Sequence, residues 1–182
     1  LDGEGHDGAQ KAGILASLAH GFWVNPKSVY TEGICSITPL DLEFARKLGY
    51  AIKLLGIVKG NGNALVQVSV YPALIPSGHV LASVGGVYNG ILVRGDVVGD
   101  TLYYGQGAGQ DATASAVLSA LAAAALDLKH ATPDRRYALV PHHTNRAVQS
   151  VDHGSCSYTL RHIVVALSLI PRLRAPTKAV CM

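Results

Sequence analysis

The sequence of 182 residues is poor in charge, in cysteine and in clustered basic residues. Charged residues make up 15% of the chain and the formal net charge is +3, which is too small to indicate a nucleic-acid partner. Three cysteines without C-x-x-C spacing fit a reducing compartment better than a disulfide scaffold. The first residues lack a basic segment followed by an apolar one, and the apolar run 112–128 is marginal for a membrane span and mostly alanine. We therefore expect a soluble, cytoplasmic protein with no membrane partner.

Hydrophobic residues, at 49%, are plentiful enough for a sizeable core or a broad partner interface. The length suits one domain or one domain with a fragment. We expect residues 1–130 to form the main domain and residues 131–182 to be a divergent or truncated tail. Within this tail His142 and His143 are adjacent, so their side chains point different ways, and no third ligand spacing accompanies them. The sequence therefore predicts no metal site.

A helix is predicted from His6 onward, after a flexible start rich in glycine and acidic residues. At about 100° per residue, one arc of roughly 100° contains five of its side chains. They are Asp7, Lys11, Ile14, Leu15 and Leu18. If the apolar members enter a core, the charged pair lies at the edge of that core, where a cleft could exchange a proton with a ligand. The alternative is an ordinary i,i+4 pair that stabilises the helix by a few tenths of a kcal/mol.

The following segments predict an α+β fold. Thr38, Pro39 and Asp41 are typical of a capped helix start, and the helix should stop at Gly49. Strands are expected at 50–58, 64–71, 87–94 and 101–104, with Pro72 and Pro76 ending the second. Glycine- and asparagine-rich turns between them indicate a mixed, largely antiparallel sheet with helices packed on one face. The other face would be available for dimerisation.

A glycine-rich loop, Gly105-Gln106-Gly107-Ala108-Gly109, separates the last of these strands from an expected helix at 112–128. Backbone N–H groups at a helix start favour anions, and glycines let a ligand approach closely. The pattern is neither G-x-G-x-x-G nor G-x-x-x-x-G-K-[ST], and by itself it is more typical of a tight turn.

Several of these stretches, taken together, resemble one family. Residues 1–21, LDGEGHDGAQKAGILASLAHG, resemble the start of the catalytic domain of homoserine dehydrogenase. The resemblance continues in order through Glu32-Gly33-Ile34, 48–57, 71–76 and 88–117. Ala112 stands where the family usually has proline before the helix threonine, and residues 157–161 only faintly resemble the opening strand of an ACT-type regulatory domain.

The resemblance implies roles for particular residues. Lys11 would give a proton to the aldehyde oxygen in reduction and accept one in oxidation. Asp7 would lie by the reacting oxygen and orient Lys11 or the substrate, and Asp2 would bind the substrate's polar groups. Gly107, Ala108 and Gly109 would contact the nicotinamide end of NADP or NAD.

The resemblance also implies partners. The substrate pair is aspartate 4-semialdehyde and homoserine, on the route to threonine and methionine, and the enzyme is expected to be a homodimer. The family's Rossmann domain is not found in these residues, so it would lie upstream or act in trans. Two alternatives stay open: a non-catalytic dimerisation or substrate-binding module of the same fold that depends on a separate nucleotide-binding partner, and another oxidoreductase with this type of domain.

Overall fold

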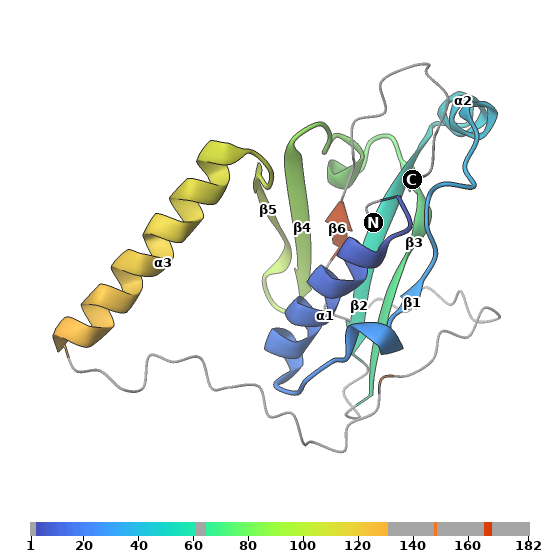
Figure 1. Cartoon of the computed structure of the whole chain (residues 1–182). Helices are drawn as coiled ribbons and strands as arrows, with labels where there is room; N and C mark the ends of the chain where they lie inside the picture. Colours follow the sequence, from blue (N-terminus) through green and yellow to red (C-terminus); the bar gives the residue numbers. More distant parts are fainter. Residues whose placement is uncertain (1–2, 61–64, 131–147, 149–165, 169–182) are drawn as a thin grey trace.

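The computed structural model describes residues 3–60, 65–130, 148 and 166–168. Asp2, His142, His143 and residues 157–161 lie outside this part of the chain. The helices are α1 (His6–His20), α2 (Pro39–Lys47) and α3 (Gln110–His130), with short 3-10 helices η1 (Pro26–Ser28) and η2 (Val80–Ala82). The strands are β1 (Tyr30–Thr31), β2 (Tyr50–Gly60), β3 (Val66–Pro76), β4 (Tyr88–Gly95), β5 (Gly99–Gln106) and β6 (Ala166–Ser168). Figure 1 shows one sheet with α1 lying across it.

The sheet has the strand order β1-β3-β2-β6-β4-β5. Among the named strands, β1 pairs with β3 in parallel and the other pairings are antiparallel. The long hairpin β2–β3 is in register from Tyr50↔Pro76 to Gly60↔Val66. These pairings confirm the expected α+β class with a mixed, largely antiparallel sheet. Strand β6 comes from the expected tail and lies between β2 and β4.

Strand β3 is longer than expected. The prediction that Pro72 ends it was wrong, since Pro72 pairs with Leu54 and the strand continues to Pro76. The short strand β1 pairs with β3 only at Ser69 and Val70. Beyond Val70 the outer side of β3 therefore has no partner from β1, and a proline without an N–H group is tolerated on such an edge.

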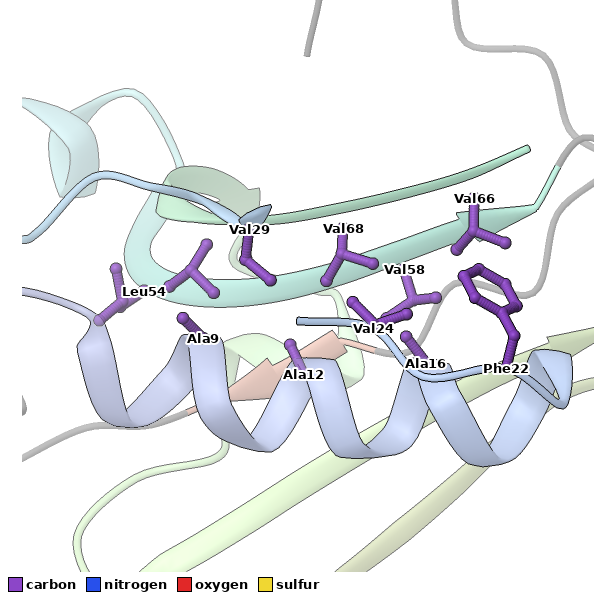
Figure 2. Close-up of a cluster of buried hydrophobic side chains, with 11 residues drawn as sticks. Ala9, Ala12, Ala16, Phe22, Val24, Val29, Leu54, Val58, Val66 and Val68 are labelled. Carbon is purple, nitrogen blue, oxygen red and sulfur yellow. The ribbon is translucent and has the colours of Figure 1, made fainter. Parts of the chain in front are cut away.

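Helix α1 buries its small residues, and the expected apolar face was wrong. Ile14 and Leu18 are 52% and 56% exposed, and Leu15 is only partly buried. The residues of α1 that are buried are Gly8, Ala9, Ala12, Gly13, Ala16 and Ser17. Their short side chains let the helix backbone come close to the sheet, as Figure 2 shows for the three alanines against valines of β2 and β3. Asp7 and Lys11 share the outward arc with Ile14 and Leu18, and both are half-buried.

The core has two parts, one on each face of the sheet. The first lies under α1 and comprises Ala9, Ala12, Ala16, Phe22, Val24, Val29, Leu54, Val58, Val66, Val68 and Val70. The second lies on the opposite face and comprises Leu55, Ile57, Ile75, Leu81, Val84 and Leu92. Residues Leu54 and Leu55 enter different parts because successive side chains of a strand point to opposite faces. Trp23 is 41% exposed, whereas its neighbours Phe22 and Val24 are buried.

Helix α2 begins as predicted. The Thr38 hydroxyl accepts from the backbone N–H of Asp41, and the Asp41 carboxylate accepts from the backbone N–H of Thr38, which together form a capping box. The helix ends at Lys47, and Gly49 follows with φ 81°, a conformation that favours glycine.

Helix α3 departs from the expected arrangement. Figure 1 shows it leaving the end of β5 and extending away from the sheet. None of its described residues is buried, and its large exposed apolar side chains are Val117, Leu118, Leu121, Leu126 and Leu128. By length and composition alone, α3 could also cross a membrane.

Candidate functional site

The start of α1 is held by Gly5, which caps the helix with φ 83°. The backbone N–H of Ala9 donates to the Gly5 carbonyl at 2.9 Å, which closes the first turn. A Cβ atom at Gly5 would lie 3.0 Å from Thr31 Cγ2 and 3.2 Å from Val70 Cγ1. Glycine is therefore required here both by the backbone conformation and by the closeness of the sheet.

Asp7 and Lys11 form an ion pair one helical turn apart. Lys11 Nζ lies 2.7 Å from Asp7 Oδ2, and the side chains are 42% and 32% exposed respectively. A pair this accessible adds little to stability, about 0.3–0.5 kcal/mol for i,i+4 partners. Its chemical capacity is greater: a lysine can donate a proton to an oxygen or accept one from it, and the carboxylate can hold an ammonium or a hydroxyl group. The structure thus brings together the two side chains that the sequence singled out.

The glycine loop at 107–109 connects β5 to α3. The Gly107 N–H donates to the Val87 carbonyl at 3.1 Å, which continues the β4–β5 pairing by one step. Gly109 has φ 121°, and its carbonyl accepts from both the backbone N–H and the hydroxyl of Thr113. Residues 107–109 are exposed, so their backbone and the first N–H groups of α3 are open to a ligand.

Asn89 is a neighbour of this loop that the sequence analysis missed. A Cβ atom at Gly107 would overlap the side-chain amide of Asn89, so the asparagine occupies the place where a side chain at 107 would stand. No motif pointed to Asn89, because the contact joins strand β4 to the loop that follows β5. The only available signal was its place in the stretch YNGILV, which belongs to the resemblance.

Lys53 is a second residue without a sequence signal. It lies on β2 and its Nζ donates to the Val84 carbonyl at 2.7 Å, next to the second part of the core. Burial lowers the pKa of Lys53, since the charged form loses water. Its carbonyl partner makes it a structural lysine of the face opposite α1.

The candidate residues occupy two places on the fold. Asp7 and Lys11 lie on α1, which packs on β2 and β3, whereas Gly107, Ala108 and Gly109 follow β5 at one end of the strand order. That the two groups face one cleft stays a prediction, and Asp2 lies outside the described residues. Within the described part of the chain no group of three or more His, Cys, Asp or Glu side chains is placed to hold a metal ion.

Known proteins resemble this chain over the same region. A family model described as homoserine dehydrogenase matches residues 1–121. The chain belongs to the homoserine dehydrogenase family. Asp7, Lys11 and the loop at 107–109 all lie inside the matched range.

Curated homoserine dehydrogenases are close in sequence. The protein from Synechocystis sp. is 49% identical over 121 residues, which cover 65% of this chain and 28% of that protein. The protein from Mycobacterium leprae is 48% identical over 128 residues, which cover 68% of this chain and 29% of that protein. The chain thus spans under a third of the length of these homoserine dehydrogenases.

Solved structures agree with the fold. A homoserine dehydrogenase from Thiobacillus denitrificans has a TM-score of 0.69 and 40% identity, over 81% of this chain and 35% of that one. The S. aureus homoserine dehydrogenase has a TM-score of 0.62 and 44% identity, over 70% of this chain and 32% of that one.

Proposed function

We propose that this chain is the catalytic and dimerisation part of an NAD(P)-dependent homoserine dehydrogenase. The reaction would interconvert aspartate 4-semialdehyde and homoserine in threonine and methionine biosynthesis, in the cytoplasm. The observation that carries the proposal is the Asp7–Lys11 pair at the start of α1, at 2.7 Å and accessible to solvent, inside the region that matches the family.

Each side chain of the pair has a part in the proposed chemistry. In reduction, the Lys11 ammonium donates its proton to the aldehyde oxygen as the carbonyl carbon receives a hydride and becomes the CH₂OH group. In oxidation, the neutral Lys11 amine accepts the hydroxyl proton. Asp7 orients the Lys11 amine through the ion pair, and Asp2 binds polar groups at the amino-acid end of the substrate. Without Lys11 the reacting oxygen would have to exchange its proton with water.

The cofactor, NADP or NAD, would supply the hydride in its reduced form and take it up in its oxidised form. The residues at 107–109 fit its nicotinamide end, because the loop is exposed and free of large side chains. Gly107, Ala108 and Gly109 would hold that end of the cofactor through their backbone. The adenosine and pyrophosphate contacts would come from a Rossmann domain upstream or in trans.

Helix α3 supports the need for this second domain. It is 21 residues long, and its four leucines and its one valine, between positions 117 and 128, are all exposed. The family match extends to residue 121 and so includes the first half of α3, which favours a protein surface over a lipid bilayer as its partner. We propose that α3 docks on the nucleotide-binding domain.

The face of the sheet opposite α1 supports a homodimer. Leu102 pairs with Leu92 of the second core part, and Tyr104 pairs with Gly90, so Leu102 and Tyr104 point to that face. Tyr88 stacks on Tyr104 with ring centroids 4.9 Å apart, and all three large side chains are exposed. An exposed aromatic patch beside a core is typical of a subunit interface.

The proposal is tested by reconstitution. The chain is mixed with a nucleotide-binding domain from a related homoserine dehydrogenase, and NADPH oxidation by aspartate 4-semialdehyde is followed. Lys11→Ala should lower kcat by about 10²–10⁴-fold, the usual contribution of a positioned proton donor. Lys47→Ala is the matched control, because Lys47 forms the same kind of i,i+4 pair with Glu43 on α2, at 2.8 Å. A mixture without turnover, or full activity in the Lys11→Ala variant, would contradict the proposal.

A further inference from the structure

Two segments far apart in the sequence touch through their backbones just before α1. The Ile34 N–H donates to the Gly3 carbonyl at 2.8 Å. A Cβ atom at Gly33 would lie 2.6 Å from the Gly3 carbonyl oxygen and 2.7 Å from Glu4 Cα. Both obstacles are backbone atoms, so any side chain at position 33 would push residues 3–4 away from the segment 31–34.

The same closeness recurs on either side of this contact. Gly5 lies against Thr31, as described above, and a Cβ atom at Gly3 would lie 2.9 Å from Cys35 Sγ. At positions 3, 5 and 33, three glycines thus stand where a side chain of their own would have no room. Glycine is unfavourable for chain entropy, so its use at three facing positions indicates that the two backbones must be close.

The segment 31–34 is in turn attached to the sheet. Thr31 pairs with Val70 in the parallel β1–β3 ladder, and the Glu32 N–H donates to the Val70 carbonyl at 2.7 Å. Val70 is completely buried in the first part of the core. The order of contacts therefore runs from the rigid sheet to residues 31–34, from these to residues 3–5, and from Gly5 into the first turn of α1, which carries Asp7.

We propose that Gly33 is a positioning residue of the substrate site: by letting residues 31–34 touch residues 3–5, it sets where the Asp7–Lys11 pair stands relative to the substrate. The inference rests on the proposed function, since it assigns that pair to the substrate. Displacing a reacting group by about 1 Å can reduce catalysis about 100-fold. The overlap that a Cβ atom at Gly33 would create requires a shift approaching that size.

Gly33→Ala tests the proposal directly. Titration calorimetry of the chain with L-homoserine should show binding weakened by about 10- to 100-fold, and in the reconstituted enzyme kcat/KM for aspartate 4-semialdehyde should fall by about 100-fold. The KM for NADPH should stay within about twofold, because the loop at 107–109 is on another part of the fold. Gly78→Ala is the matched control, since nothing lies within 4 Å of a Cβ atom there. Unchanged homoserine binding in Gly33→Ala would overturn the positioning role.

A double-mutant cycle keeps the proposal falsifiable if Gly33→Ala does not fold. Gly3→Ala places a Cβ atom against Cys35 Sγ, whereas Cys35→Ala removes that sulfur and leaves the backbone contact intact. Gly3→Ala should weaken homoserine binding by about 10-fold, Cys35→Ala should change it by less than about twofold, and the double variant should regain most of the loss. Simple additivity of the two effects would overturn the proposal.

The two proposals fail in different ways. If the unsubstituted chain does not bind L-homoserine, the substrate site itself is refuted, and the positioning role with it. If the unsubstituted chain binds and Lys11→Ala abolishes turnover while Gly33→Ala behaves as Gly78→Ala does, only the positioning role is refuted.

Discussion

Ser17 joins helix α1 to the chain that follows it. Its hydroxyl donates to the Gly13 carbonyl at 2.7 Å and accepts from the Val24 N–H at 2.8 Å, and both hydrogen bonds are buried. Val24 is itself completely buried, so water cannot replace the serine as the acceptor. This one hydroxyl fixes how the chain turns back after the helix to place Phe22 and Val24 in the core.

Ser17→Ala is expected to lower the free energy of unfolding by about 1–3 kcal/mol, because it leaves the buried Val24 N–H without its acceptor. Chemical denaturation measures the change. Ser83→Ala is the matched control, since the Ser83 hydroxyl makes an exposed hydrogen bond to the Val80 carbonyl at 2.8 Å and its loss should cost less than about 0.5 kcal/mol. Equal effects of the two substitutions would refute the assignment.

Gly107 allows a second test on a single residue. Gly107→Ala forces the Asn89 side chain to move, so we expect a loss of about 0.5–1.5 kcal/mol in stability and a higher KM for NADPH in the reconstituted enzyme. Gly105→Ala, two residues earlier, meets nothing within 4 Å and serves as the control. The pair Gly107→Ala with Asn89→Ala should recover the stability. If it does not, the contact with Asn89 is not the cause.

At the scale of elements, the sequence was sufficient to predict those features that depend only on residues close together in the chain. The capping box at Thr38 and Asp41, the stop at Gly49 and the strand-to-helix turn at 107–109 depend on neighbours within a few residues, and each is present. The i,i+4 contact of Asp7 with Lys11 is of the same kind.

Features that depend on the packing of distant segments could not be predicted from such local patterns. In α1 the apolar periodicity pointed to Ile14 and Leu18, but the sheet accepts the face with glycine and alanine because that face permits a closer backbone approach. Hydrophobicity alone does not record how near two backbones come. The same limit hid Asn89 and the contact of Gly33 with residues 3–4, since both join segments distant in sequence.

The cap of α2 makes the stability of the molecule depend on pH. The hydrogen bonds from the hydroxyl and the N–H of Thr38 hold the pKa of Asp41 below its ordinary value of 3.8. A carboxyl with a lowered pKa in the folded state stabilises above its ordinary pKa, and this contribution is lost as pH falls through the lowered value. The cap should therefore be intact at neutral pH and lost in acid.

Asp41→Asn is expected to lower the Tm at neutral pH. The difference in Tm between this variant and the unsubstituted chain should become smaller below about pH 4. Thr38→Ala should cost about 1 kcal/mol at neutral pH through loss of the same cap. Thermal unfolding followed by circular dichroism across this pH range measures both. Asp96→Asn, in the turn between β4 and β5, is the control without a helix cap. If the Tm of Asp41→Asn differed from that of the unsubstituted chain by the same amount at every pH, the proposed loss of the cap in acid would be contradicted.

At the scale of the whole molecule, α3 is the surface that we propose for association with a nucleotide-binding domain. If it docks on a nucleotide-binding domain, Leu118→Lys combined with Leu121→Lys should weaken that association by at least about 10-fold, because each leucine loses about 1.5–3 kcal/mol of apolar burial. Light scattering of the mixed domains measures the complex. Val97→Lys, an exposed residue of the β4–β5 turn, is the control. Unweakened association of the double variant would exclude α3 as the docking surface.

The architecture as a whole was predictable in class and not in arrangement. Alternating strand and turn signals indicated the antiparallel hairpins, and these are present in β2–β3 and β4–β5. No local sequence pattern indicates that β6 inserts between β2 and β4 or that α3 leaves the sheet. Each placement depends on which surfaces the other elements leave uncovered.

An α-helix of 21 residues measures about 32 Å, so α3 is about as long as a small domain is wide. Because this helix is exposed to water, the isolated polypeptide is amphiphilic, as a detergent is: it combines a polar body with a long apolar helix. The isolated chain should therefore aggregate above a threshold concentration. Co-expression with a partner that covers α3 should yield soluble protein, whereas expression of the chain alone should yield aggregates.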